Sequence, residues 1–190
     1  MKNNRKISIF FFYIGIVLSG CNKYIDTKGR LISSNGFSLK SYEDYNDFRC
    51  FSNMVSTMDT FRTVPTHFKV KLPKGILYNE IMGNSDFGFY YRKNQVIFIK
   101  VFPFTDEKYL RKDTTYIPSY NEMEDLIEAT LITSNSKLNI KKMNILKSRK
   151  HLIFSQRNMK ILLFNIEDLN VEKFKISINS LNIDSTDAEF

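Results

Sequence analysis

The sequence predicts an α+β domain in which an antiparallel sheet is covered on one face by helices. Apolar residues first follow helical spacing and then alternate with polar residues as in strands, and this change of period occurs twice before a final helical stripe. The composition of 43% apolar residues, with 17 Phe, 10 Tyr and no Trp, indicates a core dominated by aromatic side chains. The expected order is therefore helix, strands, helix, strands, helix.

The first predicted element is a helix over residues 41–58. Its apolar stripe consists of Tyr45, Phe48, Cys50 or Phe51, Val55 and Met58. These residues recur every three or four positions, and Asp44 lies three positions after Ser41, as in a capping box. The pattern is that of a helix with one apolar face.

Strand patterns follow this helix. Residues 68–72 alternate apolar and polar side chains until Pro73 ends the run, which predicts a strand with one solvated face. Residues 87–91 and 96–102 are rich in aromatic and β-branched side chains, and four polar residues, 92–95, separate them. That spacing predicts a β-hairpin.

Two further helices are predicted. After Pro118, Ser119 and Glu122 fit a capping box, and residues 123–131 carry an apolar stripe opposite acidic side chains. The closing helix is predicted from a second stripe with three- and four-residue spacing, formed by Val171, Phe174, Ile178 and Leu181.

Between these helices, residues 138–166 alternate apolar and basic side chains with breaks near Ser148-Arg149 and Arg157-Asn158. A three-stranded antiparallel meander is expected, with residues 161–164 buried at its centre. In element order the chain loosely resembles the domains of the photosystem-associated PsbP and Mog1 proteins, with Phe174 and Leu181 facing inward. The resemblance implies a fold and no function, because function depends on the site rather than on the fold.

The N-terminus has the order of an export signal. Lys2, Arg5 and Lys6 precede an apolar run at residues 7–18. This run has twelve residues, whereas a helix that spans a bilayer needs about twenty. A basic segment followed by a short apolar segment is typical of a cleaved signal peptide.

Leu18-Ser19-Gly20-Cys21 resembles the lipobox of bacterial lipoproteins at all four positions. The resemblance implies cleavage between Gly20 and Cys21, a diacylglycerol thioether on Cys21 and acylation of the new amino terminus. Two or more acyl chains hold a protein stably at a membrane. Asn22 is not the aspartate that marks inner-membrane retention in some lipoproteins, which favours the outer membrane. The open alternatives are a soluble protein with an apolar start and a signal peptide cleaved elsewhere.

These features divide the chain into four parts. Residues 1–20 are the expected signal peptide, 21–40 a polar tether, 41–183 a single α+β domain and 184–190 a frayed tail. Removal of the signal lowers the formal charge from +8 to +5, because residues 1–20 contain three basic and no acidic side chains.

The remaining reactive side chains do not form a catalytic pattern. Cys50 lies between aromatic residues, which favours a buried thiol over a reactive one. His67 and His151 lack Cys, Asp or Glu at metal-ligand spacing and are expected to be ordinary strand residues. The sequence has no Gly-x-Ser-x-Gly motif and no phosphate-binding loop. We expect no cofactor and no bound metal.

Three surface patterns have both a functional and a structural interpretation. The segment 137–160 has no acidic residue and eight basic ones, Lys137, Lys141, Lys142, Lys147, Arg149, Lys150, Arg157 and Lys160. It is either a patch for an anionic lipid or partner, or a solvated sheet face. The acidic residues Glu122, Glu124, Asp125 and Glu128 suit the first turns of a helix better than paired catalysis. The aromatic residues Phe87, Phe89, Tyr90 and Tyr91 are expected in the core rather than at a sugar-stacking surface.

The expected function is that of a membrane-anchored envelope lipoprotein that acts as a binding or accessory module. A small envelope-facing hydrolase, with a site assembled from distant residues, is the alternative, and a structural spacer is a third possibility. Its partners are the membrane, through lipid on Cys21, and an envelope protein or anionic molecule at the basic patch. We expect no nucleic-acid partner, because the chain is exported.

Overall fold

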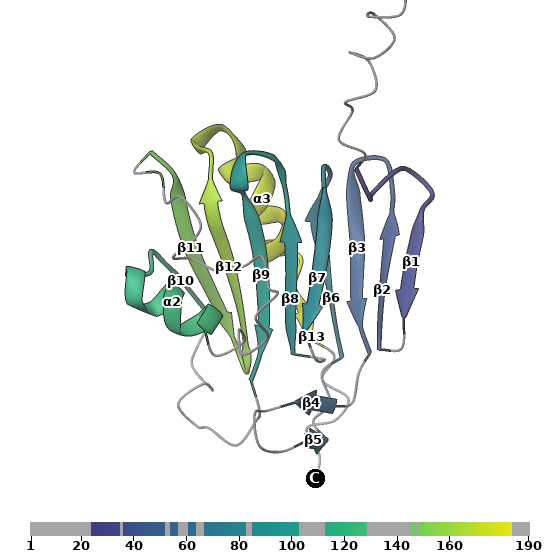
Figure 1. Cartoon of the computed structure of the whole chain (residues 1–190), viewed down its shortest axis with the longest axis horizontal. Helices are drawn as coiled ribbons and strands as arrows, with labels where there is room; N and C mark the ends of the chain where they lie inside the picture. Colours follow the sequence, from purple (N-terminus) through teal and green to yellow (C-terminus); the bar gives the residue numbers. More distant parts are fainter. Residues whose placement is uncertain are drawn as a thin grey trace, which may run out of the picture.

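Antiparallel strands make up most of the secondary structure in the described part of the computed structural model (Figure 1). The structure describes residues 24–34, 36–51, 54–56, 61–63, 67–82, 85–102, 113–128, 146 and 148–183. A five-stranded sheet has the order β1 (Leu31–Ser34), β2 (Phe37–Ser41), β3 (Tyr45–Cys50), β6 (Phe68–Pro73) and β13 (Asn182–Ile183). A six-stranded sheet has the order β10 (Thr114–Tyr116), β11 (Lys150–Gln156), β12 (Met159–Ile166), β9 (Val96–Val101), β8 (Asp86–Tyr90) and β7 (Tyr78–Met82).

The remaining described elements are short. A separate hairpin consists of β4 (Met54–Ser56) and β5 (Phe61–Thr63). The two α-helices are α2 (Tyr120–Glu128) and α3 (Val171–Asn179). Two 3₁₀ turns, η1 (Arg92–Asn94) and η4 (Asp168–Asn170), connect β8 to β9 and β12 to α3.

The main core lies between the two sheets. The ring of Phe48 on β3 is 5.2 Å from that of Phe87 and 5.0 Å from that of Phe89, both on β8 of the other sheet. Helix α3 closes the same layer, because Phe174 meets Tyr91 edge to face at 4.8 Å. Edge-to-face pairs add stabilisation beyond the area that they bury.

A second core covers the opposite face of the six-stranded sheet. Met123, Leu126 and Ile127 of α2 pack there with Phe98 and Leu162 of the central strands. Strands β9 and β12 are therefore buried on both faces, which their nearly continuous apolar sequences require.

This arrangement corrects the expected layering. We predicted one antiparallel sheet with helices on one face, but the described residues form two large sheets, and α2 and α3 pack on opposite faces of the six-stranded sheet. The coarser prediction, a fold that combines antiparallel sheet with helices, agrees with the described residues.

Four predicted elements are confirmed. The alternating run near residue 70 is β6, with Phe68, Val70 and Leu72 buried. The predicted hairpin is β8 and β9. The second and closing helices are α2 and α3, and Phe174 and Ile178 face the core as predicted. Leu181 is half-buried and packs against the same core.

The predicted helix over residues 41–58 is wrong. Residues 45–50 form β3 and residues 54–56 form β4. Asn46, Phe48 and Cys50 face inward with a period of two, and Phe48 and Cys50 fit both the helical and the strand pattern. Because Asn46 is polar, the alternation of apolar residues that indicates a strand is interrupted at its position.

The polar tether at residues 21–40 is also corrected. Strands β1 and β2 pair as a hairpin, and Gly36, in the connection between them, adopts a φ of 100°. Ile25 donates its backbone N–H to the carbonyl of Ile76 over 2.9 Å, and Asp26 is 3% exposed. The folded domain therefore begins before residue 41.

The predicted meander is described only in part. Within residues 148–166, β11 and β12 form a hairpin whose turn is the predicted break at Arg157-Asn158. Residues 161–164 are fully buried at the centre of the sheet, as predicted. Residues 138–145 and the predicted frayed tail, 184–190, lie outside the described residues.

Candidate functional site

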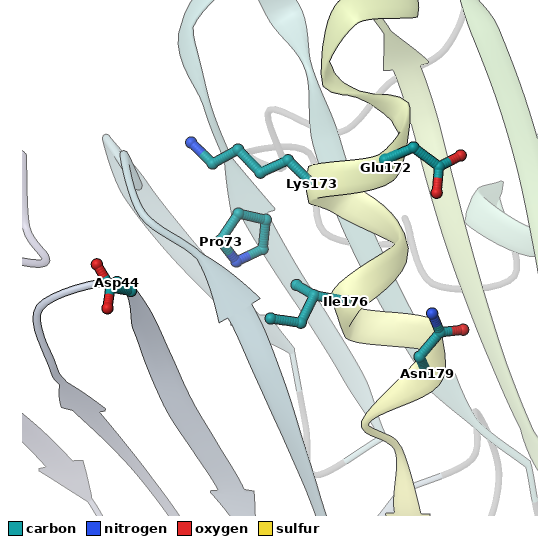
Figure 2. Close-up of a pocket in the computed structure, with 6 residues that line it drawn as sticks. All are labelled: Asp44, Pro73, Glu172, Lys173, Ile176 and Asn179. Carbon is teal, nitrogen blue, oxygen red and sulfur yellow. The ribbon is translucent and has the colours of Figure 1, made fainter.

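An open hollow of about 350 Å³ lies between α3, the end of β6 and the turn that joins β2 to β3 (Figure 2). Its lining residues are Asp44, Pro73, Glu172, Lys173, Ile176 and Asn179. These residues come from three elements that are far apart in the sequence.

The side chains of the hollow do not converge on one point. Figure 2 shows Lys173 and Ile176 extending from α3 toward the side of Pro73 and Asp44, whereas Glu172 and Asn179 extend to the other side. Lys173 donates a hydrogen bond to the carbonyl of Lys74 over 3.1 Å. The hollow thus offers an apolar floor with one cation and two carboxylates at its margins, which suits binding of a surface group rather than acid and base catalysis.

A buried polar network fixes the wall of this hollow. The Pro73 carbonyl accepts hydrogen bonds from Asn46 Nδ2 at 3.0 Å and from the Tyr91 hydroxyl at 3.3 Å. Asp26 Oδ2 accepts from Asn46 Nδ2 at 2.9 Å and from the Gly75 backbone at 2.8 Å. Burial, and secondly the charge of Asp26, raise the pKa of Tyr91 well above its ordinary value, so this phenol keeps its proton.

A second polar cluster lies on the α2 face of the six-stranded sheet. Lys100 Nζ is 3.1 Å from Asp86 Oδ1, and both side chains are only 9% exposed. The Ser85 hydroxyl donates to the other Asp86 oxygen over 2.6 Å. In the strand register, Lys160 stands opposite Lys100 on the next strand, and both amines lie over the ring of Phe102.

This second cluster is a buried ion pair with its hydrogen bonds satisfied. A serine nucleophile needs a base that takes up its proton. The acceptor of the Ser85 proton is a carboxylate that is already bound to an ammonium group. The geometry therefore corresponds to a structural ion pair.

The aromatic set lies in the interior, as predicted. Phe87 and Phe89 are fully buried, and Tyr90 and Tyr91 are each 5% exposed. Tyr90 stacks on Tyr78 with 4.1 Å between ring centroids. Burial and the nearby Glu80 raise the pKa of Tyr78 to about 12. These side chains form no exposed sugar-stacking surface.

The predicted lipid-attachment residue, Cys21, lies outside the described residues. Cys50 is buried at 3% exposure, as predicted. His151 lies on β11 as expected, and His67 is half-buried one position before β6. Within the described ranges, no group of three or more His, Cys, Asp and Glu side chains is placed to hold a metal ion. In the same part of the chain, neither helix has the length and apolar character needed to cross a bilayer.

The charged segments are placed as follows. Four of the eight basic residues are described, and they separate to opposite ends of the β11–β12 hairpin. Arg149 pairs with Glu167 at 3.0 Å and Lys150 with Asp168 at 3.8 Å at one end, and Arg157 and Lys160 lie at the other. In the acidic cluster, Glu122 accepts the backbone N–H of Ser119 over 2.8 Å, so it is a helix cap.

Sequence reasoning missed the hollow and both buried polar clusters. For Asp86 and Lys100 the predicted loop gives the wrong register. Pairing outward from a loop at residues 92–95 places Phe87 opposite Lys100, whereas the structure pairs Tyr90 with Val96 and therefore Asp86 with Lys100. No local pattern connects Asp26 with Asn46, because these residues meet only through tertiary packing.

The chain matches no protein-family model, and no curated protein or solved structure is significantly similar to it.

Proposed function

We propose that the protein is a cell-envelope lipoprotein that is anchored by lipid on Cys21, at the outer membrane, and acts as a binding or accessory module. The observation that carries the location is the sequence Leu18-Ser19-Gly20-Cys21 after a short apolar run. The open hollow, with an apolar floor and charged margins, supports binding as the activity.

The partners that we propose are the membrane and an envelope protein or anionic molecule. The hollow provides one surface for such a partner, and Arg157 and Lys160 provide a second one at the turn of the β11–β12 hairpin. The PsbP and Mog1 likeness of element order remains part of this proposal. It is weakened by the second sheet, which that order did not anticipate.

A small envelope-facing hydrolase is the alternative. The cluster that most resembles a catalytic site is formed by Ser85, Asp86 and Lys100, because it combines a hydroxyl with ionisable groups. This cluster is buried, and its groups bind one another, so a substrate would not reach them. We therefore prefer the binding module to the hydrolase.

The anchor is tested by intact mass and membrane partition in a bacterium that processes lipoproteins. Wild type is compared with Cys21→Ala, and Cys50→Ala serves as the matched control because it removes the other cysteine. We expect wild type and Cys50→Ala to lose residues 1–20, gain acyl mass and partition with membranes, and Cys21→Ala to do none of the three. Equal behaviour of wild type and Cys21→Ala would reject the anchor.

The binding activity is tested by co-purification with envelope proteins from detergent-solubilised membranes. Lys173→Glu alters the margin of the hollow, and Lys175→Glu alters a residue of α3 that does not line it. We expect loss of the partner with Lys173→Glu alone. A partner that both variants retain binds elsewhere.

A further inference from the structure

We propose that the end of the domain formed by η1 and η4 rests on the bilayer, with the side chain of Leu169 inserted among the lipids. This inference rests on the proposed lipid anchor and adds to it an orientation and a contact residue. Its occupant is the membrane to which the chain is attached.

The first step is the length of the connection. Ile25 is bound to Ile76 through a backbone hydrogen bond, and the guanidinium of Arg92 lies 5.0 Å from the ring centroid of Tyr24. Only Asn22 and Lys23 separate Tyr24 from Cys21. Three extended residue steps span at most about 11 Å. A lipid on Cys21 therefore holds this end of the domain within about a nanometre of the headgroups.

The second step places Leu169 at the same end. Lys93, next to Arg92 in η1, pairs with Glu167 at 2.7 Å, and Asn170 donates to Gln95 over 3.0 Å. These contacts join η1 to η4, where Leu169 lies. Figure 1 shows the β8–β9 turn and the β12–α3 connection together at the upper end of the strands.

The third step is the exposure of the leucine itself. The side chain of Leu169 is 98% exposed, the highest value among the exposed large apolar residues of the described chain. Leu146, at 38% exposure, is nearby, because its carbonyl accepts the backbone N–H of Arg149 and Arg149 pairs with Glu167. Apolar side chains held at a bilayer surface gain free energy when they leave water for the acyl boundary.

Charges of both signs lie at this end. Three exposed ion pairs, Lys28 with Glu43, Lys93 with Glu167 and Lys150 with Asp168, are joined by two further cations, Arg92 and Arg149. These cations add an attraction to anionic lipid, whereas burial of the leucine side chain does not depend on the charge of the lipid. Insertion should therefore occur in neutral membranes as well.

The test uses the absence of tryptophan from the chain. Leu169→Trp introduces a single fluorophore at the proposed contact. Phe51→Trp introduces one at a residue that is 49% exposed and follows β3 at the opposite end of the strands. Both full-length variants are produced with lipid, checked by intact mass and thermal unfolding, and reconstituted into phosphatidylcholine vesicles with or without dibrominated acyl chains.

We expect brominated lipid to lower the emission of Leu169→Trp at least about twofold, with a shift to shorter wavelength, and to leave Phe51→Trp unchanged. Lipidated variants that co-sediment with vesicles but show no quenching at position 169, or equal quenching at both positions, would overturn the orientation while the anchor stands. Proteins without acyl mass that stay in solution would reject the anchor and, with it, this inference.

Discussion

His151 Nδ1 accepts a hydrogen bond from the backbone N–H of Asn165 over 3.2 Å. Asn165 has a φ of 57° inside β12, opposite the point at which the β11–β12 register shifts. The backbone of a β-bulge turns away from the regular ladder and leaves a donor unpaired. The imidazole satisfies that donor and packs against Phe164 at 4.8 Å between centroids.

This contact predicts a pH dependence of stability. Burial lowers the pKa of His151 below 6.5, so the folded protein holds fewer protons than the unfolded chain below that pH. The stabilisation that comes from neutral His151 should be fully present above pH 6.5. It should be lost, and the free energy of unfolding should decrease, as the pH falls toward the folded-state pKa of His151. Urea unfolding between about pH 7 and pH 5 should show a weaker decrease for His151→Gln than for wild type. Parallel curves for the two proteins would refute the role of His151.

Asp26 should be a major determinant of stability. Replacement by Ala leaves the Gly75 N–H and one of the two N–H groups of the buried Asn46 amide without an acceptor, at a cost of about 3 kcal/mol. Glu43→Ala is the matched control, because the Lys28–Glu43 pair is exposed and contributes less than about 1 kcal/mol. Chemical unfolding measures both, and equal losses would contradict the importance of the buried network.

The buried pair of Lys100 and Asp86 should show strong coupling. Lys100→Met strands a buried carboxylate and should cost about 3 to 5 kcal/mol of the free energy of unfolding. Adding Asp86→Leu removes that uncompensated charge, so the double variant should be more stable than Lys100→Met alone. A double-mutant cycle in urea measures the coupling, and simple additivity of the two changes would disprove it.

The cap of α2 gives a smaller prediction. Ser119 Oγ accepts the N–H of Glu122 over 3.2 Å, and Glu122 accepts the N–H of Ser119 in return. Ser119→Ala should cost about 1 kcal/mol, whereas Ser119→Asp should keep most of the cap. Thermal unfolding of the two variants compares them, and an equal decrease in both would mean that the side-chain cap contributes little.

Elements with a single clear period could be predicted from the sequence. The apolar residues of β6 alternate from Phe68 to Leu72, and the closing helix has a stripe in which Phe174 and Ile178 reach the core. Strand β3 was misread because its inward face contains Asn46, a polar residue whose burial depends on Asp26. A local pattern cannot reveal a partner that lies twenty positions away.

The hollow could not be predicted from the sequence either, because its lining residues are far apart in the chain. Asp44, Pro73 and Ile176 line one hollow only after two turns and a helix have been brought together by the sheets. None of these residues has an unusual neighbour in the sequence. The pattern at Cys21 is local in the sequence, and lipid attachment there stays a prediction.

The ring of Phe48 on β3 packs against Phe87 and Phe89 on β8, so the opening of one sheet is coupled to the opening of the other. Neither sheet can open without exposing the aromatic cluster of the other. Amide hydrogens of β3 and β8 should therefore exchange with solvent through one common opening event rather than through two independent ones. The domain then behaves as a single cooperative unit, despite having two hydrogen-bonded sheets.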